Sequence, residues 1–502
     1  MNLDQRRSGI LLHVTSLPGP HGIGDFGPAA FAFVDWLATA GQSIWQWLPS
    51  TPIGPSDSPY QGVSAFAGSQ WMVALEPLVE KGWLNAPSLP EEGFDATQVD
   101  YARVLPWREQ QLRNAAAGFT ARASNQDRAL FSEWCSTELD WLEDYSLFMA
   151  IRSPVNGQPW WEWPAPLARR DPTALATARS EYAEQMQFWQ FVQWCFATQC
   201  AALRAHAHSN GVQIMGDLPI FVAHDSADCW SRPDLYHLDE DFQTTVVAGA
   251  PPDELGPLGQ RWGNPLYRWE RMAAEDYAWW TARVRRALQQ VDVLRIDHFR
   301  GFAAYWEIPA SSPTAQLGRW VQAPGAELFA AIGRALGPLP IVAEDLGFIT
   351  PDVIALRDNC GFPGMRILQF AFGGDGAHEF LPHNYSRASV VYTGTHDNET
   401  ACGWWDNAPP HERDFAALYL HANRDDVHWR MIQAACNSIA DMAVFPLQDV
   451  LGLDGSHRMN LPGSLQGNWS WRFNWSMLDA NVAGSLQLIV AASGRGPAPQ
   501  AA

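Results

Sequence analysis

Lysine is almost absent from this sequence of 502 residues, in which Lys81 is the only one. Chemistry that needs a lysine, such as a pyridoxal phosphate Schiff base or a lysine-dependent aldol reaction, therefore has a single candidate. Lys81 stands before Gly82 at the end of an expected helix, which favours a structural position at the surface. The sequence also lacks Gly-Lys-Ser/Thr, which excludes a P-loop nucleotide site. We expect no organic cofactor.

Paired cysteines and long apolar runs are missing as well. The seven cysteines are odd in number, widely spaced and without a Cys-x-x-Cys pair, which argues for reduced thiols and against a disulfide framework or a zinc site. No stretch approaches the ~18 consecutive apolar residues of a membrane helix. Arg6 and Arg7 precede a short apolar run that His13 interrupts, and no small-residue cleavage site follows. We expect a soluble cytoplasmic protein with no membrane partner.

Positive charge is scarce. The sequence has 33 lysine and arginine residues against 54 aspartate and glutamate residues, a net charge of −21 at pH 7, and its basic clusters are no longer than two adjacent arginines. Such a charge repels phosphate backbones and anionic lipids. A nucleic-acid partner is therefore not expected.

Tryptophan, by contrast, is abundant, with 26 residues that include three adjacent pairs. Sugar rings stack their flat C–H faces on aromatic rings, so carbohydrate-active enzymes are often rich in tryptophan. Most of these side chains are nonetheless expected to fill a core. The hydrophobic fraction of 47% indicates a folded globular chain.

Short apolar runs that end in polar residues recur along the chain, separated by segments of helical pattern. Eight such units predict parallel strands with helical crossovers that close as a (β/α)8 TIM barrel spanning 1–502. The eight runs are 10–14, 43–48, 213–216, 293–296, 340–343, 365–370, 389–392 and 442–447.

The spacing of these runs predicts insertions at the barrel rim. Residues 85–205, between the second and third strands, have helical patterns and predict a mainly helical inserted subdomain. Residues 219–290 are rich in glycine and proline and predict a second, loop-rich inserted subdomain that contributes substrate contacts. Residues 494–502 are expected to form a flexible tail.

Barrel active sites lie at the carboxyl ends of the strands, where this sequence places Asp217, Asp297, Glu344 and Asp397. Four carboxylates on one rim are costly unless something uses them. Arg295 stands two residues before Asp297 and so faces the same side of the strand, which holds that carboxylate ionised and suits a nucleophile. A buried structural ion pair is the alternative.

Glu344 and Asp345 are neighbours, so only one of them points at the barrel axis. A glutamate in a partly apolar pocket keeps its proton and serves as a general acid. The alternative places Asp345 as a helix cap and Glu344 outside the site. His396, beside Asp397, is expected to donate a hydrogen bond, since no metal-binding histidine spacing is present and we expect no metal. Paired carboxylates about 5–5.5 Å apart in a tryptophan-rich cleft fit glycosyl transfer through a covalent intermediate.

Longer sequence motifs are spread over nearly the whole chain, from residues 13–18 to residues 469–472. Together they closely resemble the 4-α-glucanotransferases of glycoside hydrolase family 77, also called amylomaltases or disproportionating enzymes. The motifs are DSPYQ at 57–61, SAFAG at 64–68, GDLPIFVAHD at 216–225, WGNPLY at 262–267, RIDHFRG at 295–301, AEDLG at 343–347, GTHDNE at 394–399 and PLQDVLG at 446–452.

The resemblance implies a role for each matching position. Asp297 corresponds to the nucleophile, Glu344 to the acid/base and Asp397 to a third carboxylate that holds the donor sugar. The family transfers a segment of an α-1,4-glucan to the 4-hydroxyl of glucose or a maltodextrin acceptor, without an organic cofactor or a catalytic metal. The residues implied to bind substrate are Arg295, His396, Tyr60, Asp217 and Trp262, with Ser58, Gln260 and Asn460 as weaker matches.

One loop departs from the family pattern. Relatives usually have two aromatic residues after a Pro-Pro-Asp sequence, whereas this chain has Glu254 and Leu255 after Pro251-Pro252-Asp253. Without both rings, stacking of the acceptor and exclusion of water are weakened. We predict a retained transferase with altered acceptor affinity or more hydrolysis.

Three other functions stay open on the residues alone. An α-amylase-like hydrolase shares the three carboxylates. An enolase-type Mg²⁺ site also uses acids after the third, fourth and fifth strands, but it commonly needs a lysine base, for which Lys81 is poorly placed. A glucan-binding protein without activity is disfavoured because Asp297, Glu344 and Asp397 are intact.

Overall fold

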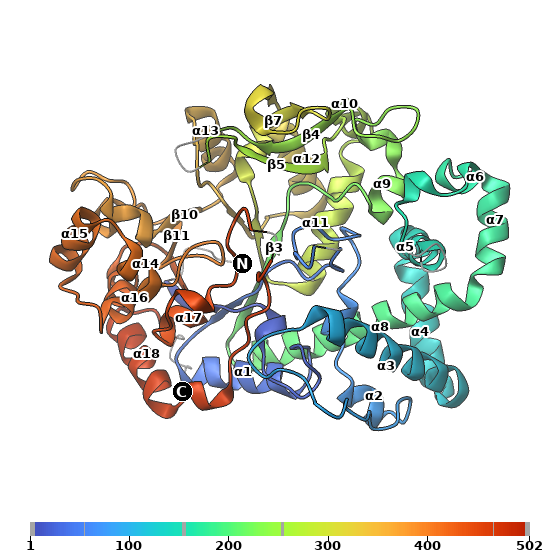
Figure 1. Ribbon diagram of the computed structural model, residues 1–502, viewed down its shortest axis with the longest axis horizontal. Coiled ribbons are helices and arrows are strands. Elements are labelled where there is room, and N and C mark those ends of the chain that lie inside the picture. Colours follow the sequence, from blue (N-terminus) through green and yellow to red (C-terminus); the bar gives the residue numbers. More distant parts are fainter. Residues whose placement is uncertain (1–5, 55, 153–156, 253–255, 465, 497–502) are drawn as a thin grey trace.

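Eight parallel strands form the centre of the molecule (Figure 1). The computed structural model describes residues 6–54, 56–152, 157–252, 256–464 and 466–496. Neighbours in the sheet follow the order β10-β11-β12-β1-β2-β3-β6-β9, and the ends of this order meet where the N–H of Ala343 donates to the carbonyl of Pro363 at 2.9 Å. The sheet is therefore a nearly closed barrel. Its strands are β1 (Arg7–Leu11), β2 (Ile44–Gln46), β3 (Gln213–Leu218), β6 (Val293–Ile296), β9 (Ile341–Ala343), β10 (Gly364–Ile367), β11 (Ser389–Tyr392) and β12 (Met442–Pro446).

The predicted TIM barrel is confirmed, with one strand shifted. The first run was expected at 10–14, but β1 begins at Arg7, which pairs with Met442 of β12, and residues Val14–Ser16 form a 3-10 turn. The shift arises because pairing with strands distant in the sequence, rather than the apolar run itself, sets the start of β1.

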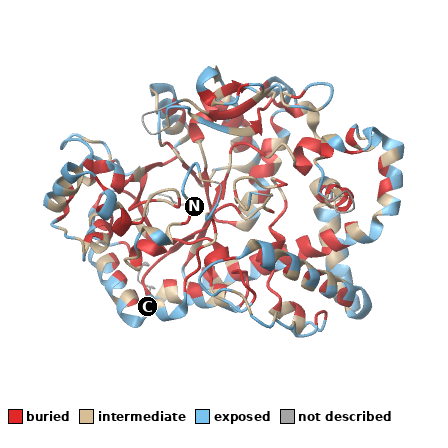
Figure 2. Ribbon diagram, in the orientation of Figure 1, coloured by how far each residue is buried: buried red, intermediate tan, exposed pale blue. Residues whose placement is uncertain are grey.

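Helices surround the barrel with buried inner faces and exposed outer faces (Figure 2). Local signals set their ends: the Asp479 carboxylate accepts the N–H groups of Asn481 and Val482 where α18 begins, and Gly361 ends α13 with φ of 69°. These helices are α1 (Pro28–Thr39), α8 (Ala183–Ser209), α11 (Ala278–Gln290), α12 (Gly325–Leu336), α13 (Pro351–Cys360), α14 (Ala401–Asn407), α15 (Pro410–Leu420), α16 (Val427–Asn437), α17 (Leu447–Val450) and α18 (Ala480–Ala492).

The segment between β2 and β3 is an inserted group of helices, blue to green at the right of Figure 1. It has its own aromatic core, in which Phe119 lies 4.9 Å from Trp83 and 5.5 Å from Trp194 between ring centroids. Lys81 ends its first helix with the side chain 56% exposed and paired with Asp127, so the predicted surface position is confirmed. Before α8 the helices are α2 (Glu76–Glu80), α3 (Tyr101–Arg122), α4 (Asn125–Thr137), α5 (Leu139–Arg152), α6 (Ala165–Ala168) and α7 (Pro172–Glu181).

The second insertion differs from the loop-rich subdomain predicted at 219–290. It contains short helices α9 (Ala227–Ser231) and α10 (Trp269–Ala274) and half of a four-stranded antiparallel sheet, called the rim sheet here, in the order β5-β4-β7-β8. The sheet extends to Gln322, because β4 pairs with β7 across about 60 residues (Val247 opposite Ile308), a distance that no local pattern reveals. The rim sheet strands are β4 (Val246–Ala250), β5 (Gln260–Pro265), β7 (Ala304–Pro309) and β8 (Arg319–Gln322).

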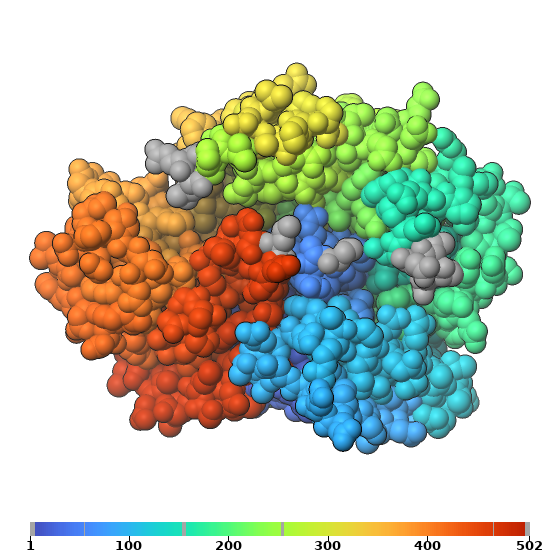
Figure 3. Space-filling model, viewed as in Figure 1, coloured from blue at the N-terminus to red at the C-terminus, as the bar shows by residue number. Residues whose placement is uncertain are grey.

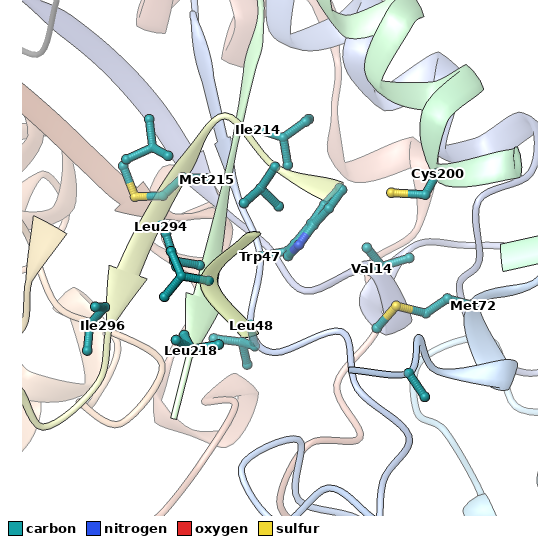
Figure 4. Close-up of a cluster of buried hydrophobic side chains, with 14 of the residues drawn as sticks. Val14, Trp47, Leu48, Met72, Cys200, Ile214, Met215, Leu218, Leu294 and Ile296 are labelled. Carbon is teal, nitrogen blue, oxygen red and sulfur yellow. The ribbon is translucent and has the colours of Figure 1, made fainter. Parts of the chain in front are cut away.

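A tryptophan-rich core fills the space between the barrel and its helices. Trp47 is 1% exposed and lies at the centre of the cluster in Figure 4, with Ile214 and Leu294 on one side and Val14 on the other. Trp45 is fully buried, and its indole N–H donates to the carbonyl of Leu12 at 2.8 Å. The expectation that many tryptophans are structural holds for these two.

The flexible tail predicted at 494–502 is wrong for its first residues. Arg495 is fully buried, and its guanidinium donates to several carbonyl groups near the end of α16 and the start of β12, among them those of Cys436, Ser438 and Ala440. These bonds hold the chain through residue 495, while 497–502 lie outside the described residues. Within the described ranges, the helices are all too short or too polar to cross a bilayer.

Candidate active site

The parallel barrel brings the four predicted carboxylates to one rim. Asp217 is the penultimate residue of β3, and Asp297 and Glu344 directly follow β6 and β9. Asp397 lies in the loop after β11. They are close enough that Asp217, Glu344 and Asp397 all raise the pKa of Asp297. In Figure 3, blue N-terminal and red C-terminal segments meet at the centre of one face beneath the yellow-green rim sheet.

Arg295 connects two of these acids. Its guanidinium donates to Asp217 Oδ2 at 2.6 Å and lies 3.0 Å from Asp297 Oδ1. Tyr60 also donates its hydroxyl to Asp217 Oδ2, at 2.8 Å. The Asp217 side chain is fully buried whereas that of Asp297 is 30% exposed, so Asp217 supports Arg295 from behind and Asp297 faces the cleft.

Glu344, not Asp345, faces Asp297. Its carboxyl oxygens accept the N–H groups of His298 at 2.6 Å and Leu346 at 3.0 Å. His298 has a left-handed conformation, φ 50°, which aims its N–H at Glu344. Asp345 turns away and accepts from Arg357 and from the N–H of Met365, so the alternative in which Asp345 caps a helix and Glu344 lies outside is wrong.

Asp397 is the most open of the four acids, with a side chain that is 46% exposed. Its Oδ1 accepts from the amide of Asn460 at 2.6 Å and lies 3.4 Å from His396 Nε2. The Asn460 N–H in turn donates to the carbonyl of His396 at 3.1 Å. The structure thus brings two of the residues predicted to bind substrate, His396 and Asn460, onto Asp397.

Aromatic rings line the cleft beside these acids. Tyr60 stacks on His396 with ring centroids 5.3 Å apart and planes 14° apart, and Trp469 contacts both rings. On the rim sheet, Trp262 lies edge-to-face on His298 at 4.8 Å. This arrangement offers flat apolar faces for sugar rings beside the carboxylates.

Two of the three weaker predicted contacts, Ser58 and Gln260, lie in supporting positions. Ser58 accepts the N–H of Tyr60 with its hydroxyl at 3.2 Å, which fixes the turn that presents the tyrosine. Gln260 accepts the indole N–H of Trp262 at 3.0 Å. Trp469 and His298 were not predicted as site residues, although the RIDHFRG motif contains His298 and the resemblance extended to 469–472.

Burial raises the pKa of both Asp297 and Glu344, and Arg295 opposes the rise at each. The prediction that Arg295 holds Asp297 ionised is therefore incomplete, because burial and the neighbouring acids outweigh it. Asp297, whose pKa is raised to about 8, and Glu344, whose pKa is also raised, therefore retain a shared proton near neutral pH. The proton is better placed on Glu344, since Arg295 bonds Asp297 directly while Glu344 accepts from uncharged N–H groups.

The histidines of the site are neutral. Burial lowers the pKa of His396, and it lowers the pKa of His298 to about 3. Because both rings are neutral, Arg295 is the cation shared by Asp217 and Asp297. In an enolase-type site, Mg²⁺ would take that position between the acids. Elsewhere in the described chain, His21, Asp25 and Glu76 lie close enough to share a metal ion, but Arg108 pairs with Asp25 there at 3.1 Å.

Comparisons with known proteins identify the family. The 4-alpha-glucanotransferase family model matches residues 12–478. The 4-alpha-glucanotransferase of Thermus thermophilus is 49% identical over 475 residues, covering 93% of this chain and 94% of its own, and that of Synechocystis is 46% identical over 499 residues, covering 98% and 99%. The solved amylomaltase from Streptococcus agalactiae in complex with acarbose superposes with a TM-score of 0.94 at 36% identity, covering 98% of this chain and all of its own. The chain belongs to the 4-alpha-glucanotransferase family and is an enzyme of the glycosyltransferase type.

Proposed function

We propose that the chain transfers a segment of an α-1,4-glucan to the 4-hydroxyl of glucose or another α-1,4-glucan, with retention, through a covalent glycosyl-aspartate. The observation that supports this mechanism is the unequal environment of the two central acids. Asp297 is bonded by a guanidinium, which favours its ionised form, and Glu344 is held by two main-chain N–H groups beside it. Two carboxyl groups in such unequal environments can take different roles, one as the nucleophile and the other as the acid.

In the first step, Asp297 attacks the anomeric carbon of the donor sugar. Arg295 binds Oδ1, so Oδ2 is the oxygen that forms the new bond. Glu344 gives its proton to the glycosidic oxygen as the bond from that oxygen to the anomeric carbon breaks. The shorter glucan leaves with a free 4-hydroxyl, and the donor segment remains as an ester on Asp297.

In the second step, the 4-hydroxyl of an acceptor attacks the same carbon. Glu344, now ionised, takes the hydroxyl proton, and the ester bond to Asp297 breaks. Two inversions give net retention. One α-1,4 bond is broken and one is formed, so the reaction is close to thermoneutral.

Neighbouring residues are proposed to bind the two sugars on either side of this point. Asp397, His396 and Arg295 hold the hydroxyls of the donor sugar, and Tyr60 stacks beside it. Trp262, on the rim sheet next to His298, stacks the acceptor and helps exclude water. A sugar then reaches the ester before water, which separates transfer from hydrolysis.

Incubation with maltotriose tests this proposal. We expect free glucose together with a ladder of longer maltodextrins, because each transfer lengthens one chain and shortens another. Asp297→Ala removes the nucleophile and is expected to abolish the ladder, a loss of at least about 10⁴-fold. Asp406→Ala, which removes a surface partner of Arg424, serves as the matched control and retains activity.

Two results contradict the proposal. Glucose and maltose without longer products show a hydrolase, the α-amylase-like alternative. An unchanged ladder from Asp297→Ala removes the covalent aspartate mechanism while leaving transferase activity in place.

A further inference from the structure

Arg458 joins two loops that the proposed mechanism treats separately. It stands in the segment after α17, and sequence patterns gave no indication of a role for it. Its guanidinium uses all three nitrogens: Nη2 donates to the carbonyl of Asp397 at 2.8 Å, Nε donates to the carbonyl of Asn460 at 2.9 Å, and Nη1 lies 3.4 Å from Glu399 Oε2. The side chains of Arg458 and Glu399 are 21% and 22% exposed.

These bonds lie on both sides of the contact that orients Asp397. Asn460 gives its amide to Asp397 Oδ1 at 2.6 Å, and Arg458 holds the main-chain carbonyl of each partner of that bond. Apart from this bond and the contact with His396 Nε2, the Asp397 side chain is 46% exposed. Its position therefore depends on the fixed separation of the two loops, which the guanidinium sets together with the bond from the Asn460 N–H to the carbonyl of His396.

Glu399 keeps the guanidinium in place. Its Oε1 accepts the N–H of Thr400 at 3.2 Å, and its main-chain carbonyl accepts from the side chain of Gln369 at 2.7 Å. Gly403 and Gly455 give its carboxylate room, since a Cβ on either would approach a carboxylate oxygen within 2.7 Å. Glu399 therefore lies in a fixed position beside Arg458 and balances its charge.

We propose that Arg458 and Glu399 are positioning residues, which hold Asp397 in the geometry that grips the donor sugar. The inference rests on the proposed function of Asp397. Lysine at 458 keeps the charge but presents a single ammonium, which does not span three acceptors in the fixed directions of a guanidinium. The structure therefore predicts that charge alone does not replace Arg458.

A double-mutant cycle tests this with the full-length protein: wild type, Arg458→Lys, Asp397→Asn and the double variant. We measure kcat and KM for maltotriose disproportionation, and acarbose affinity by calorimetry. Arg458→Lys is expected to lower kcat about 10- to 100-fold through misplacement of Asp397, with a smaller effect on KM. In the Asp397→Asn background the same change is expected to have almost no further effect. Glu399→Gln should show a weaker loss of the same kind.

Arg424→Lys is the matched control, because Arg424 also forks onto a carboxylate, that of Asp406, away from the site. Its activity and melting temperature are expected to stay at wild-type values. Wild-type kcat in Arg458→Lys, or a full additional loss in the Asp397→Asn background, overturns the inference alone. Full activity in Asp397→Asn instead removes the proposed role of Asp397, on which the inference rests.

Discussion

The two sides of the cleft are built differently. The floor, formed by Tyr60, Asp217, Arg295 and Asp297, is cross-linked by charged or phenolic hydrogen bonds of 2.6 to 3.0 Å, and Arg295 is 4% exposed. The opposite side, where we propose that the acceptor binds, is the edge of the rim sheet, in which Gln260 is exposed and Trp262 half-buried. In the proposed reaction, the chemistry is thus placed on rigid, preorganised groups, while acceptor choice and water exclusion depend on a more adjustable edge.

The largest expected effect concerns the acid beside the floor. Glu344→Gln keeps the shape of the side chain and one accepting oxygen for the main-chain N–H groups of His298 and Leu346, but it cannot donate a proton to the leaving sugar, so transfer from maltotriose is expected to fall about 10²- to 10⁴-fold. A donor whose leaving group needs no proton, such as α-maltosyl fluoride, should release fluoride at near wild-type rate in the first turnover. The measurement is fluoride release against disproportionation in the same protein.

Asp345→Asn is the matched control on the neighbouring acid, which turns away from the cleft. It is expected to reduce stability, because it removes the charge opposite Arg357 and leaves one accepting oxygen for Arg357 and the N–H of Met365, while folded protein keeps its ratio of fluoride to maltotriose activity. Equal loss on both donors in Glu344→Gln contradicts the acid assignment.

The acid assignment also shows why part of the site was predictable from sequence. Asp217, Asp297 and Glu344 directly follow or end local apolar runs, and local runs became strands because their two faces are buried. The carboxyl ends of parallel strands then meet at one rim. The order of elements was enough to place these groups together.

Other parts of the structure depend on pairings that local sequence does not encode. The rim sheet needs β4 opposite β7, and the site needs Asn460 and Arg458 beside Asp397, more than 60 residues away. The buried Arg495 likewise bonds carbonyls across the barrel base. Family resemblance supplied Asn460, but nothing supplied Arg458 or Arg495, because a single arginine in a polar segment has no periodic signal.

An intermediate effect is expected from the charge at the floor. Arg295 lowers the pKa of both Asp297 and Glu344. Activity needs Asp297 ionised, which sets the acidic limb of the pH profile, and Glu344 protonated, which sets the alkaline limb. Arg295→Gln removes the lowering at both, so both limbs are expected to move to higher pH, whereas Arg295→Lys keeps the charge and moves them less. The measurement is kcat/KM across pH for the three proteins.

Stability supplies a second readout of the same change. Arg295→Gln leaves the fully buried Asp217 without its counter-charge, which is expected to cost about 3–5 kcal/mol of unfolding free energy. Arg424→Gln, at an exposed pair, should change neither the pH profile nor the melting temperature appreciably. Limbs that stay in place or move to lower pH in Arg295→Gln contradict the assigned charge balance.

The smallest expected effect belongs to the acceptor side, in the loop where Glu254 and Leu255 replace the aromatic pair of relatives. These two residues lie outside the described ones, but the loop joins β4 to β5, and β5 presents Gln260 and Trp262. Glu254→Tyr with Leu255→Phe restores two rings to the loop that precedes β5, and one aromatic contact is worth about 0.5–1.5 kcal/mol. The ratio of hydrolysis to transfer is expected to fall about 2- to 10-fold. Glu254→Gln with Leu255→Met adds no ring and controls for the loss of charge. If both double variants give the same ratio of glucose release to chain lengthening, the loop does not control water exclusion, and the adjustable acceptor side reduces to Trp262 itself.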